Sequence, residues 1–90
     1  MADVRFTGHA VEALRKKGIA EEDVISALQS PDIRAVDMLT GHFVAVRKNG
    51  RWLVVVYDAA HGGIEVITVY EVSRKTQIER RIKRGRWVEA

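Results

Sequence analysis

Apolar residues in the first third of the chain recur at the three- and four-residue spacing that places them on one side of a helix. The two apolar stripes are Ala10, Val11 and Leu14, followed by Val24, Ala27 and Leu28. Thr7 can cap the first helix, Gly18 can end it, and Pro31 stops the second. The pattern therefore predicts two short amphipathic helices that form a helical hairpin.

From residue 33 onward, β-branched and aromatic residues lie in short runs that are bounded by turn residues, which is typical of strands. Asn49-Gly50 is the strongest two-residue hairpin signal, because both residues tolerate a positive φ. Ser73 then caps a last helix that runs to about Arg84 and ends at Gly85. We expect one α+β domain over residues 1–90, with a four-stranded antiparallel meander and a basic helical extension over 73–90. The predicted strands are Ile33–Leu39, His42–Lys48, Arg51–Asp58 and Ile64–Val72.

The Asn49-Gly50 turn also predicts which side chains share a face of the sheet, since opposed residues point the same way. The turn pairs Val46 with Leu53, and a symmetric turn around His61 extends the pattern to the fourth strand. One predicted face is aliphatic and should pack on the helical hairpin; it holds Val44, Val46, Leu53, Val55, Ile67 and Val69. The other face holds Phe43, Ala45, Arg47, Trp52, Val54, Val56, Val66, Thr68 and Tyr70.

Two interpretations of this second face stay open. In the first, the C-terminal helix covers it through Ile78 and Ile82, and Trp52 fills a core. In the second, Trp52 and Tyr70 stack bases while Arg47 binds phosphate. Both interpretations hold if the helix covers only part of the face.

The formal net charge is +3, but the charges are unevenly distributed. Residues 73–87 carry seven basic side chains and one acidic side chain, a net charge of +6, whereas the rest of the chain carries a net charge of −3. Such asymmetry indicates a polyanionic partner, an acidic protein partner or a solvated helix. The residues expected to bind nucleic acid are Arg74, Lys75, Arg80, Arg81, Lys83 and Arg84.

His9 is the most suggestive titratable residue, because it lies in the first turn of a predicted helix, where the helix dipole disfavours imidazolium. A neutral histidine beside a phosphodiester can act as a general base; the alternative is a surface or packing histidine. His42 and His61 lack the spacing of a zinc site and the chain has no cysteine, so we expect no metal and no other cofactor. The apolar runs are too short to cross a membrane, and Met1–Arg5 does not resemble the start of a signal peptide. We expect a cytoplasmic protein.

An ordered series of short motifs resembles a family of small prokaryotic domains of unknown function. Its members begin with Phe-Ser/Thr-x-His-Ala, as in residues 6–10, and end near Ile-Thr-x-Tyr, as in residues 67–70. That family is similar to the RelE/ParE and BrnT toxins, in which two helices lead into a curved antiparallel sheet. Many of these toxins are metal-independent ribonucleases that cut messenger RNA, and antitoxins occlude their concave face. The resemblance implies site residues at His9, Arg47, Thr68 and Tyr70.

The leading hypothesis is a RelE-like, RNA-binding protein that acts as a toxin-type endoribonuclease, with an antitoxin as its protein partner. His9 or Tyr70 would move the proton, and Arg47 with the basic helix would stabilise the negative charge. Two alternatives stay open. One is a non-enzymatic interaction module, which includes a homodimer, and the other is a nucleic-acid-binding accessory without catalysis.

Overall fold

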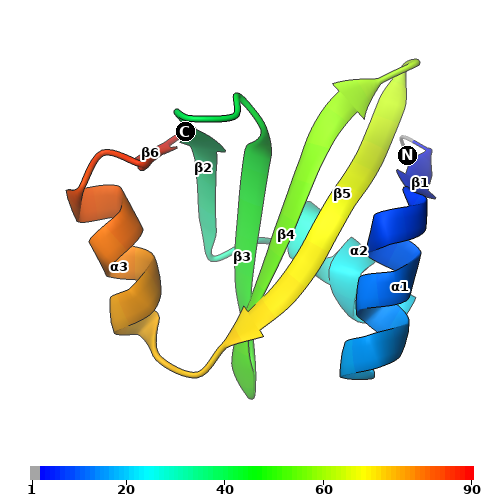
Figure 1. The fold of residues 1–90 in the computed structure, drawn as a ribbon, viewed down its shortest axis with the longest axis horizontal. Helices are drawn as coiled ribbons and strands as arrows, with labels where there is room; N and C mark the ends of the chain where they lie inside the picture. Colours follow the sequence, from blue (N-terminus) through cyan, green and yellow to red (C-terminus); the bar gives the residue numbers. More distant parts are fainter. Residues whose placement is uncertain (1–2) are drawn as a thin grey trace.

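The computed structural model describes residues 3–90; Met1 and Ala2, on which the expectation about a signal peptide partly rests, lie outside the described residues. Three helices and six strands follow one another along this part of the chain (Figure 1). The helices are α1 (Gly8–Lys17), α2 (Glu21–Gln29) and α3 (Lys75–Lys83). The strands are β1 (Val4–Phe6), β2 (Ile33–Asp37), β3 (Phe43–Asn49), β4 (Arg51–Ala60), β5 (Gly63–Val72) and β6 (Trp87–Glu89).

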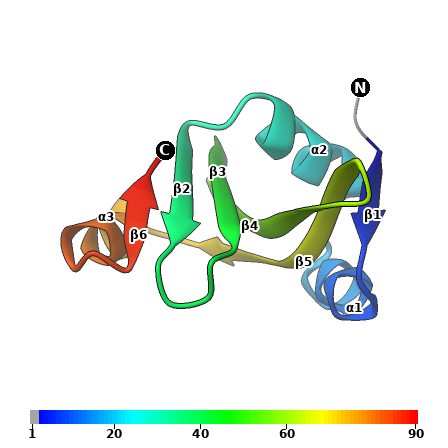
Figure 2. The ribbon, with the colours of Figure 1, turned by 90° about the horizontal axis from the view of Figure 1, so that it is seen from above.

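All six strands join one mixed sheet in the order β1-β5-β4-β3-β2-β6. The antiparallel meander from β2 to β5 is confirmed, and so is the α+β class. The prediction of only four strands is wrong, because β1 adds to β5 in parallel and β6 adds to β2 antiparallel. Both additional strands contain three residues, which is too short for a periodic pattern to stand out. Figures 1 and 2 show α1 and α3 at opposite ends of the sheet.

Thr7 connects the first helix to the sheet. Its hydroxyl accepts a hydrogen bond from the backbone N–H of Ala10 at 3.1 Å, which is the predicted cap of α1. The same hydroxyl donates to the carbonyl of Ile67 on β5 at 3.0 Å, and the Thr7 N–H donates to the Val66 carbonyl at 3.0 Å. At the other end, Gly18 adopts φ 64° and ends α1 as predicted. One side chain therefore caps a helix and fixes it against a strand.

The register of the β3–β4 hairpin differs by one residue from the prediction. Asn49 pairs with Arg51 and Val46 pairs with Val54, so the turn is centred on Gly50, which adopts φ 73°. Because side chains alternate across a strand, the shift exchanges the two faces of β3 relative to β4. The structure places Ala45 with Leu53 and Val55, and it places Val44 and Val46 with Val54, contrary to the predicted faces.

A β-bulge in β5 changes the alternation once more. The pairing passes from Tyr57 with Val66 to Val56 with Thr68, which leaves Ile67 as the extra residue. Thr68 and Tyr70 therefore lie on the face of Trp52, as predicted, and Val69 lies with Leu53 and Val55. Val66 lies with Val69 rather than on the Trp52 side, contrary to the prediction.

The sheet separates two apolar cores. On the first, which we name the α1/α2 face, Ala10, Leu14, Val24, Ala27 and Leu28 pack on Ala45, Leu53, Val55, Val66 and Val69. On the second, which we name the Trp52 face, Ile78 of α3 and Trp87 of β6 pack with Ala35, Val44, Val46 and Val54. The C-terminal helix thus covers part of the second face through Ile78 and Ile82, while Trp52 and Tyr70 stay only partly buried. The first sequence-based interpretation, in which the helix covers the face, is thus confirmed for part of it, and base stacking on Trp52 and Tyr70 stays a prediction.

The helix α3 begins one residue later than predicted, since Arg74 rather than Ser73 is its N-cap; it ends before Gly85 as predicted. In residues 3–90, no helix combines the length and the apolar content that a membrane crossing needs.

Replacement of Thr7 by Val should remove both hydroxyl hydrogen bonds and lower the free energy of unfolding by about 1–2 kcal/mol. Thr7→Ser keeps the hydroxyl and should lose much less. Urea unfolding followed by circular dichroism gives both values. Equal stability of the two variants would show that the hydroxyl does not fix α1 to β5.

Candidate nucleic-acid interface

Trp52 and Tyr70 lie on the same face of neighbouring strands, and cationic side chains flank both rings. The Lys48 and Lys75 ammonium groups lie 5.8 and 5.7 Å from the centre of the Trp52 ring. The Lys17 ammonium lies 5.7 Å from the centre of the Tyr70 ring, and the Arg81 guanidinium lies 5.8 Å from it. These distances are within the range of cation–π contacts. The two aromatic rings and their cations form one continuous surface, the Trp52–Tyr70 surface.

Burial raises the pKa of the Tyr70 hydroxyl, although the positive charges of Arg81 and Arg86 oppose the increase. The hydroxyl therefore stays protonated at neutral pH and can donate a hydrogen bond, but it is a poor base. Thr68 lies on the same face, opposite Val56. Of the four residues that the resemblance implied for catalysis, the sheet brings Thr68 and Tyr70 together on one face.

Arg47 does not belong to this surface. It pairs with Leu53, whose side chain is buried in the α1/α2 core, so the two side chains point to that face. Its guanidinium Nη1 donates to the Ser30 carbonyl at the end of α2, at 2.6 Å. The prediction that Arg47 meets Trp52 and Tyr70 is therefore wrong, and the cause is the one-residue shift at Gly50. Arg47 ties the end of α2 to the sheet.

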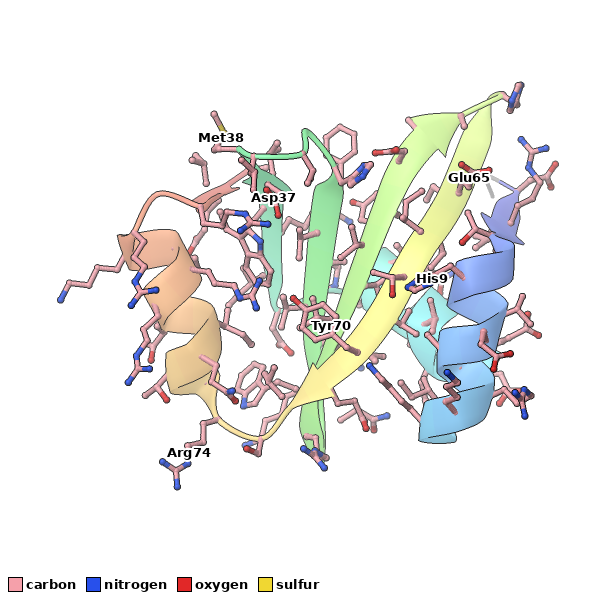
Figure 3. The ribbon with its side chains drawn as sticks, viewed as in Figure 1. His9, Asp37, Met38, Glu65, Tyr70 and Arg74 are labelled. Carbon is pink, nitrogen blue, oxygen red and sulfur yellow. The ribbon has the colours of Figure 1, made fainter. Side chains whose placement is uncertain are left out.

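His9 is exposed in the first turn of α1. Figure 3 shows its side chain extending from α1 toward β5, on the same side of the sheet as Tyr70. The neighbours of His9 in the Phe6–Ala10 motif have structural roles, since Phe6 and Ala10 pack in the α1/α2 core and Thr7 caps the helix. No packing or hydrogen-bonding role in residues 3–90 accounts for His9 in the same way.

The basic residues of α3 and of the segments beside it have different surroundings. Lys75 and Arg81 contact the aromatic rings of the Trp52 face, whereas Arg74 extends away from the sheet (Figure 3). Lys83 borders a separate shallow hollow with Thr76, Glu79 and Arg80. A pocket of about 370 Å³ at the C-terminal end of α3 is lined by Gln77, Arg80, Arg81, Arg84 and Arg86.

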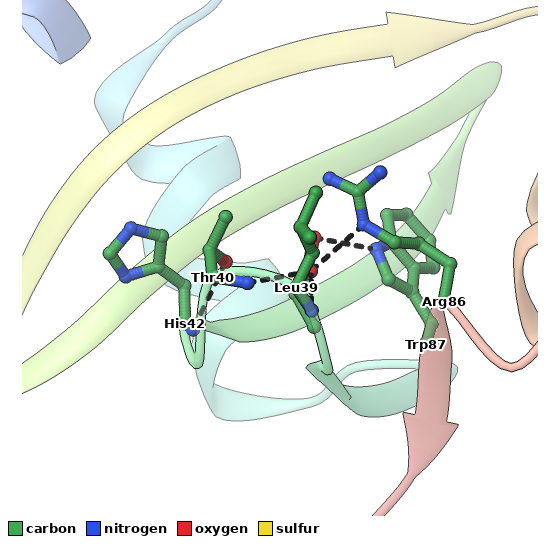
Figure 4. A network of polar contacts seen from close by, with 6 residues as sticks. Leu39, Thr40, His42, Arg86 and Trp87 are labelled. Atoms are coloured by element: carbon green, nitrogen blue, oxygen red, sulfur yellow. Dashed lines mark hydrogen bonds and ion pairs between the residues drawn. The ribbon is translucent and has the colours of Figure 1, made fainter.

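Asp37 holds one wall of that pocket in place (Figure 4). Its Oδ1 accepts from Arg86 Nε at 2.9 Å and from the backbone N–H groups of Leu39 and Thr40 at 2.9 and 3.2 Å. Its Oδ2 accepts from the indole N–H of Trp87 at 3.3 Å. Asp37 is thereby joined to Arg86 and Trp87, which lie 49 and 50 positions later in the chain, and the whole β6 segment is fixed beside β2.

Two opposing effects set the pKa of Asp37. Burial alone would raise it, but the hydrogen bonds from Arg86, Leu39 and Thr40 and the charge of Arg86 lower it from 3.8 to about 2. Asp37 is therefore a carboxylate at neutral pH, and it compensates one of the arginines around the pocket.

Asp37, Arg86 and Trp87 were not predicted as site residues. The alternation in Arg86-Trp87-Val88-Glu89 after Gly85 is a weak strand signal. No local pattern relates that segment to Asp37, because the pairing depends on where β6 joins the sheet. In residues 3–90, no three metal-ligand side chains gather closely enough to hold a metal ion.

The chain belongs to the family described as Domain of unknown function (DUF4258), which matches residues 6–71. The match includes His9, Asp37, Trp52 and Tyr70 and ends before α3. Comparison with curated proteins and with solved structures finds no match. Both rings of the Trp52–Tyr70 surface thus belong to the family region, as do Lys17 and Lys48. The cations Lys75 and Arg81 and all the residues that line the arginine pocket lie beyond it.

Replacement of Asp37 by Asn should lower the free energy of unfolding by about 2–3 kcal/mol at pH 7, because Arg86 loses its buried ionic partner. The pKa of Asp37 is lower in the folded protein than its ordinary value, so the carboxylate stabilises the fold above about pH 4, and this contribution is lost as the pH falls toward about 2. Urea unfolding of both proteins from pH 7 to pH 2 should show the difference shrinking across this window. Glu79→Gln, which neutralises an exposed carboxylate, is the control; a difference that is the same at every pH would contradict the assignment.

Proposed function

We propose that this protein binds single-stranded RNA on the Trp52–Tyr70 surface. The observation that carries the proposal is the juxtaposition of two partly exposed aromatic rings on neighbouring strands with cations within 6 Å of each ring. Aromatic rings stack with unpaired bases, and flanking lysine and arginine side chains neutralise the phosphates. Double-stranded nucleic acid does not expose base faces, so this chemistry favours a single strand.

The distribution of charge supports the same proposal. The basic helix α3 lies along the Trp52 face, and the negative charge near the surface is compensated, since Asp37 is paired with Arg86. Tyr70 lies on β5 between α1 and α3 (Figure 3), and Lys17 of α1 and Arg81 of α3 both approach its ring. A strand of RNA laid across the Trp52–Tyr70 surface would meet Tyr70 and Trp52 in turn and reach the arginines of α3.

Replacement of Trp52 by Ala should weaken binding of a short unstructured RNA about 5- to 150-fold, the loss expected for one stacked base. Fluorescence anisotropy at fixed salt measures the affinity. Phe43→Ala is the matched control, because Phe43 is also a partly exposed aromatic residue of the sheet but stacks on Tyr57, away from the Trp52 face. Equal losses in the two variants would contradict a specific role for Trp52, and affinity that is insensitive to salt would contradict phosphate contact.

We further propose that the protein is a RelE-like endoribonuclease, the activity implied by its resemblance to the RelE/ParE toxins. The two helices that precede an antiparallel meander, and the position of His9 on the Tyr70 side of the sheet, support this finer proposal. His9 would remove the proton from a ribose 2′-hydroxyl, and the 2′-oxygen would attack the adjacent phosphorus. The bond to the 5′-oxygen would break, and that oxygen would take a proton from Tyr70, whose raised pKa keeps it protonated. Arg81 would stabilise the extra negative charge, in place of Arg47, which lies on the other face.

Incubation of the purified protein with RNA in the presence of EDTA should yield fragments with 2′,3′-cyclic phosphate and 5′-hydroxyl ends. His9→Ala should reduce the rate of cleavage about 10²- to 10⁴-fold, the contribution typical of a general base. His61→Asn is the control, because His61 lies in the β4–β5 turn with φ 51°, a conformation that Asn tolerates. RNA that stays intact with the unaltered protein would end the enzymatic proposal and leave the binding proposal standing.

One observation favours a second function, a protein-interaction module. Met38, Leu39 and Val88 are 62%, 75% and 49% exposed, and they adjoin Phe43 around β6 and the β2–β3 turn. Such a group of exposed apolar side chains is typical of a surface that binds another protein or a second copy of the chain. Light scattering separates the functions: association that Phe43→Ala abolishes, without any RNA binding, would favour the interaction module.

A further inference from the structure

The pocket at the end of α3 carries more positive charge than the protein compensates. Four arginines line it, and of these four only Arg86 forms an ion pair with a carboxylate of residues 3–90. Arg80, Arg81 and Arg84 therefore leave three uncompensated guanidinium groups around a single pocket. Holding like charges together costs free energy, which a bound anion would offset.

Two of the arginines are held in place by other side chains. Asp37 accepts the Nε–H of Arg86 at 2.9 Å, which fixes the position of that guanidinium group. The Arg81 guanidinium lies 5.1 Å from the centre of the Trp87 ring and 5.8 Å from that of Tyr70. A guanidinium that lies over aromatic rings is held by cation–π attraction, which uses none of its N–H donors. The donors of Arg86 and Arg81 are thus oriented before any ligand arrives.

Gln77 adds a neutral donor to the pocket. Its amide oxygen accepts from the backbone N–H of Arg74 at 3.4 Å, which leaves the amide nitrogen to donate elsewhere. The lining side chains therefore supply one amide donor and four guanidinium groups, the kind of donor set that an oxyanion requires. A volume of about 370 Å³ accommodates a phosphate group with part of the molecule that carries it.

We propose that this pocket binds a phosphate monoester, and that on the RNA of the proposed function it receives a terminal phosphate of the strand. A monoester carries a charge of about −1.5 to −2 at pH 7 and presents three acceptor oxygens. A backbone diester carries only one negative charge. Three uncompensated guanidiniums match the monoester more closely, and bidentate arginine contacts add directionality. The second half of this proposal depends on the RNA-binding function, whereas the first half does not.

The direct test uses adenosine 5′-monophosphate, with adenosine as the uncharged control. In ¹⁵N NMR titrations of the full chain, the monophosphate should shift the backbone amides of Gln77, Arg84 and Arg86, and adenosine should not. Arg84→Gln should weaken this binding about 10-fold or more, because it removes a charge-assisted donor. Lys83→Gln is the matched control: it removes one positive charge from the adjacent exposed residue, outside the pocket lining, and should weaken binding less than about 3-fold. If the monophosphate causes no shift, or if the two variants lose equal affinity for it, the proposed phosphate site is refuted.

The second test uses RNA of one sequence with a 5′-hydroxyl, a 5′-phosphate or a 3′-phosphate. A terminal phosphate should increase the affinity at one of the two ends, and Arg84→Gln should abolish the increase while Lys83→Gln keeps it. An increase that survives in Arg84→Gln would overturn the placement of the RNA end in the pocket. Binding of the monophosphate together with no binding of any RNA would instead refute the proposed function and leave the phosphate site established.

Discussion

The Asp37 carboxylate is the contact on which the second face of the sheet depends. A buried carboxylate is costly unless donors surround it, and Asp37 receives hydrogen bonds from two backbone N–H groups, the Trp87 indole and Arg86. The same contacts bring Trp87 under α3, where it is 2% exposed and is the largest fully buried side chain of residues 3–90. Without this anchor, β6 would lose its fixed place beside β2, α3 would lose its support, and the arginine pocket would lose the wall that Arg86 forms.

Local sequence signals predicted the elements of the fold well, and non-local contacts limited the rest. The Thr7 cap, the Gly18 terminator and Pro31 mark both N-terminal helices, because capping and chain termination act within a few residues. The predicted β3–β4 register was wrong, because no feature of the sequence distinguishes two registers that differ by one residue at Gly50. That single shift nevertheless exchanges the faces of a strand. The bulge at Ile67 is equally invisible in the sequence, although it restored the predicted side for Thr68 and Tyr70.

The same distinction applies to the candidate site. Trp52 and Tyr70 were predictable as a pair because neighbouring strands carried them, and the basic character of α3 followed from composition alone. Arg47 was misplaced by the register shift and in fact binds the end of α2. Asp37 and Arg86 could not be found, because a carboxylate in a strand and an arginine 49 residues later carry no shared pattern. A cluster of charges along the chain can be identified from the sequence, whereas a charge pair between distant segments can be predicted only when the topology is known.

The family region ends at residue 71, so the surface described here is composite. The matched part supplies Trp52, Tyr70 and Asp37, and the segment after it supplies Trp87 and the arginines. Arg81 joins the two parts, because its guanidinium contacts Tyr70 from the first and Trp87 from the second. A positive charge held between two aromatic rings, with no carboxylate partner among residues 3–90, stays available to an anion while its position is fixed. A domain of this family that lacked the C-terminal segment would keep the aromatic rings with Lys17 and Lys48 but lose Lys75, Arg81 and the pocket. Any RNA affinity of the bare domain should therefore be weaker and depend less on salt.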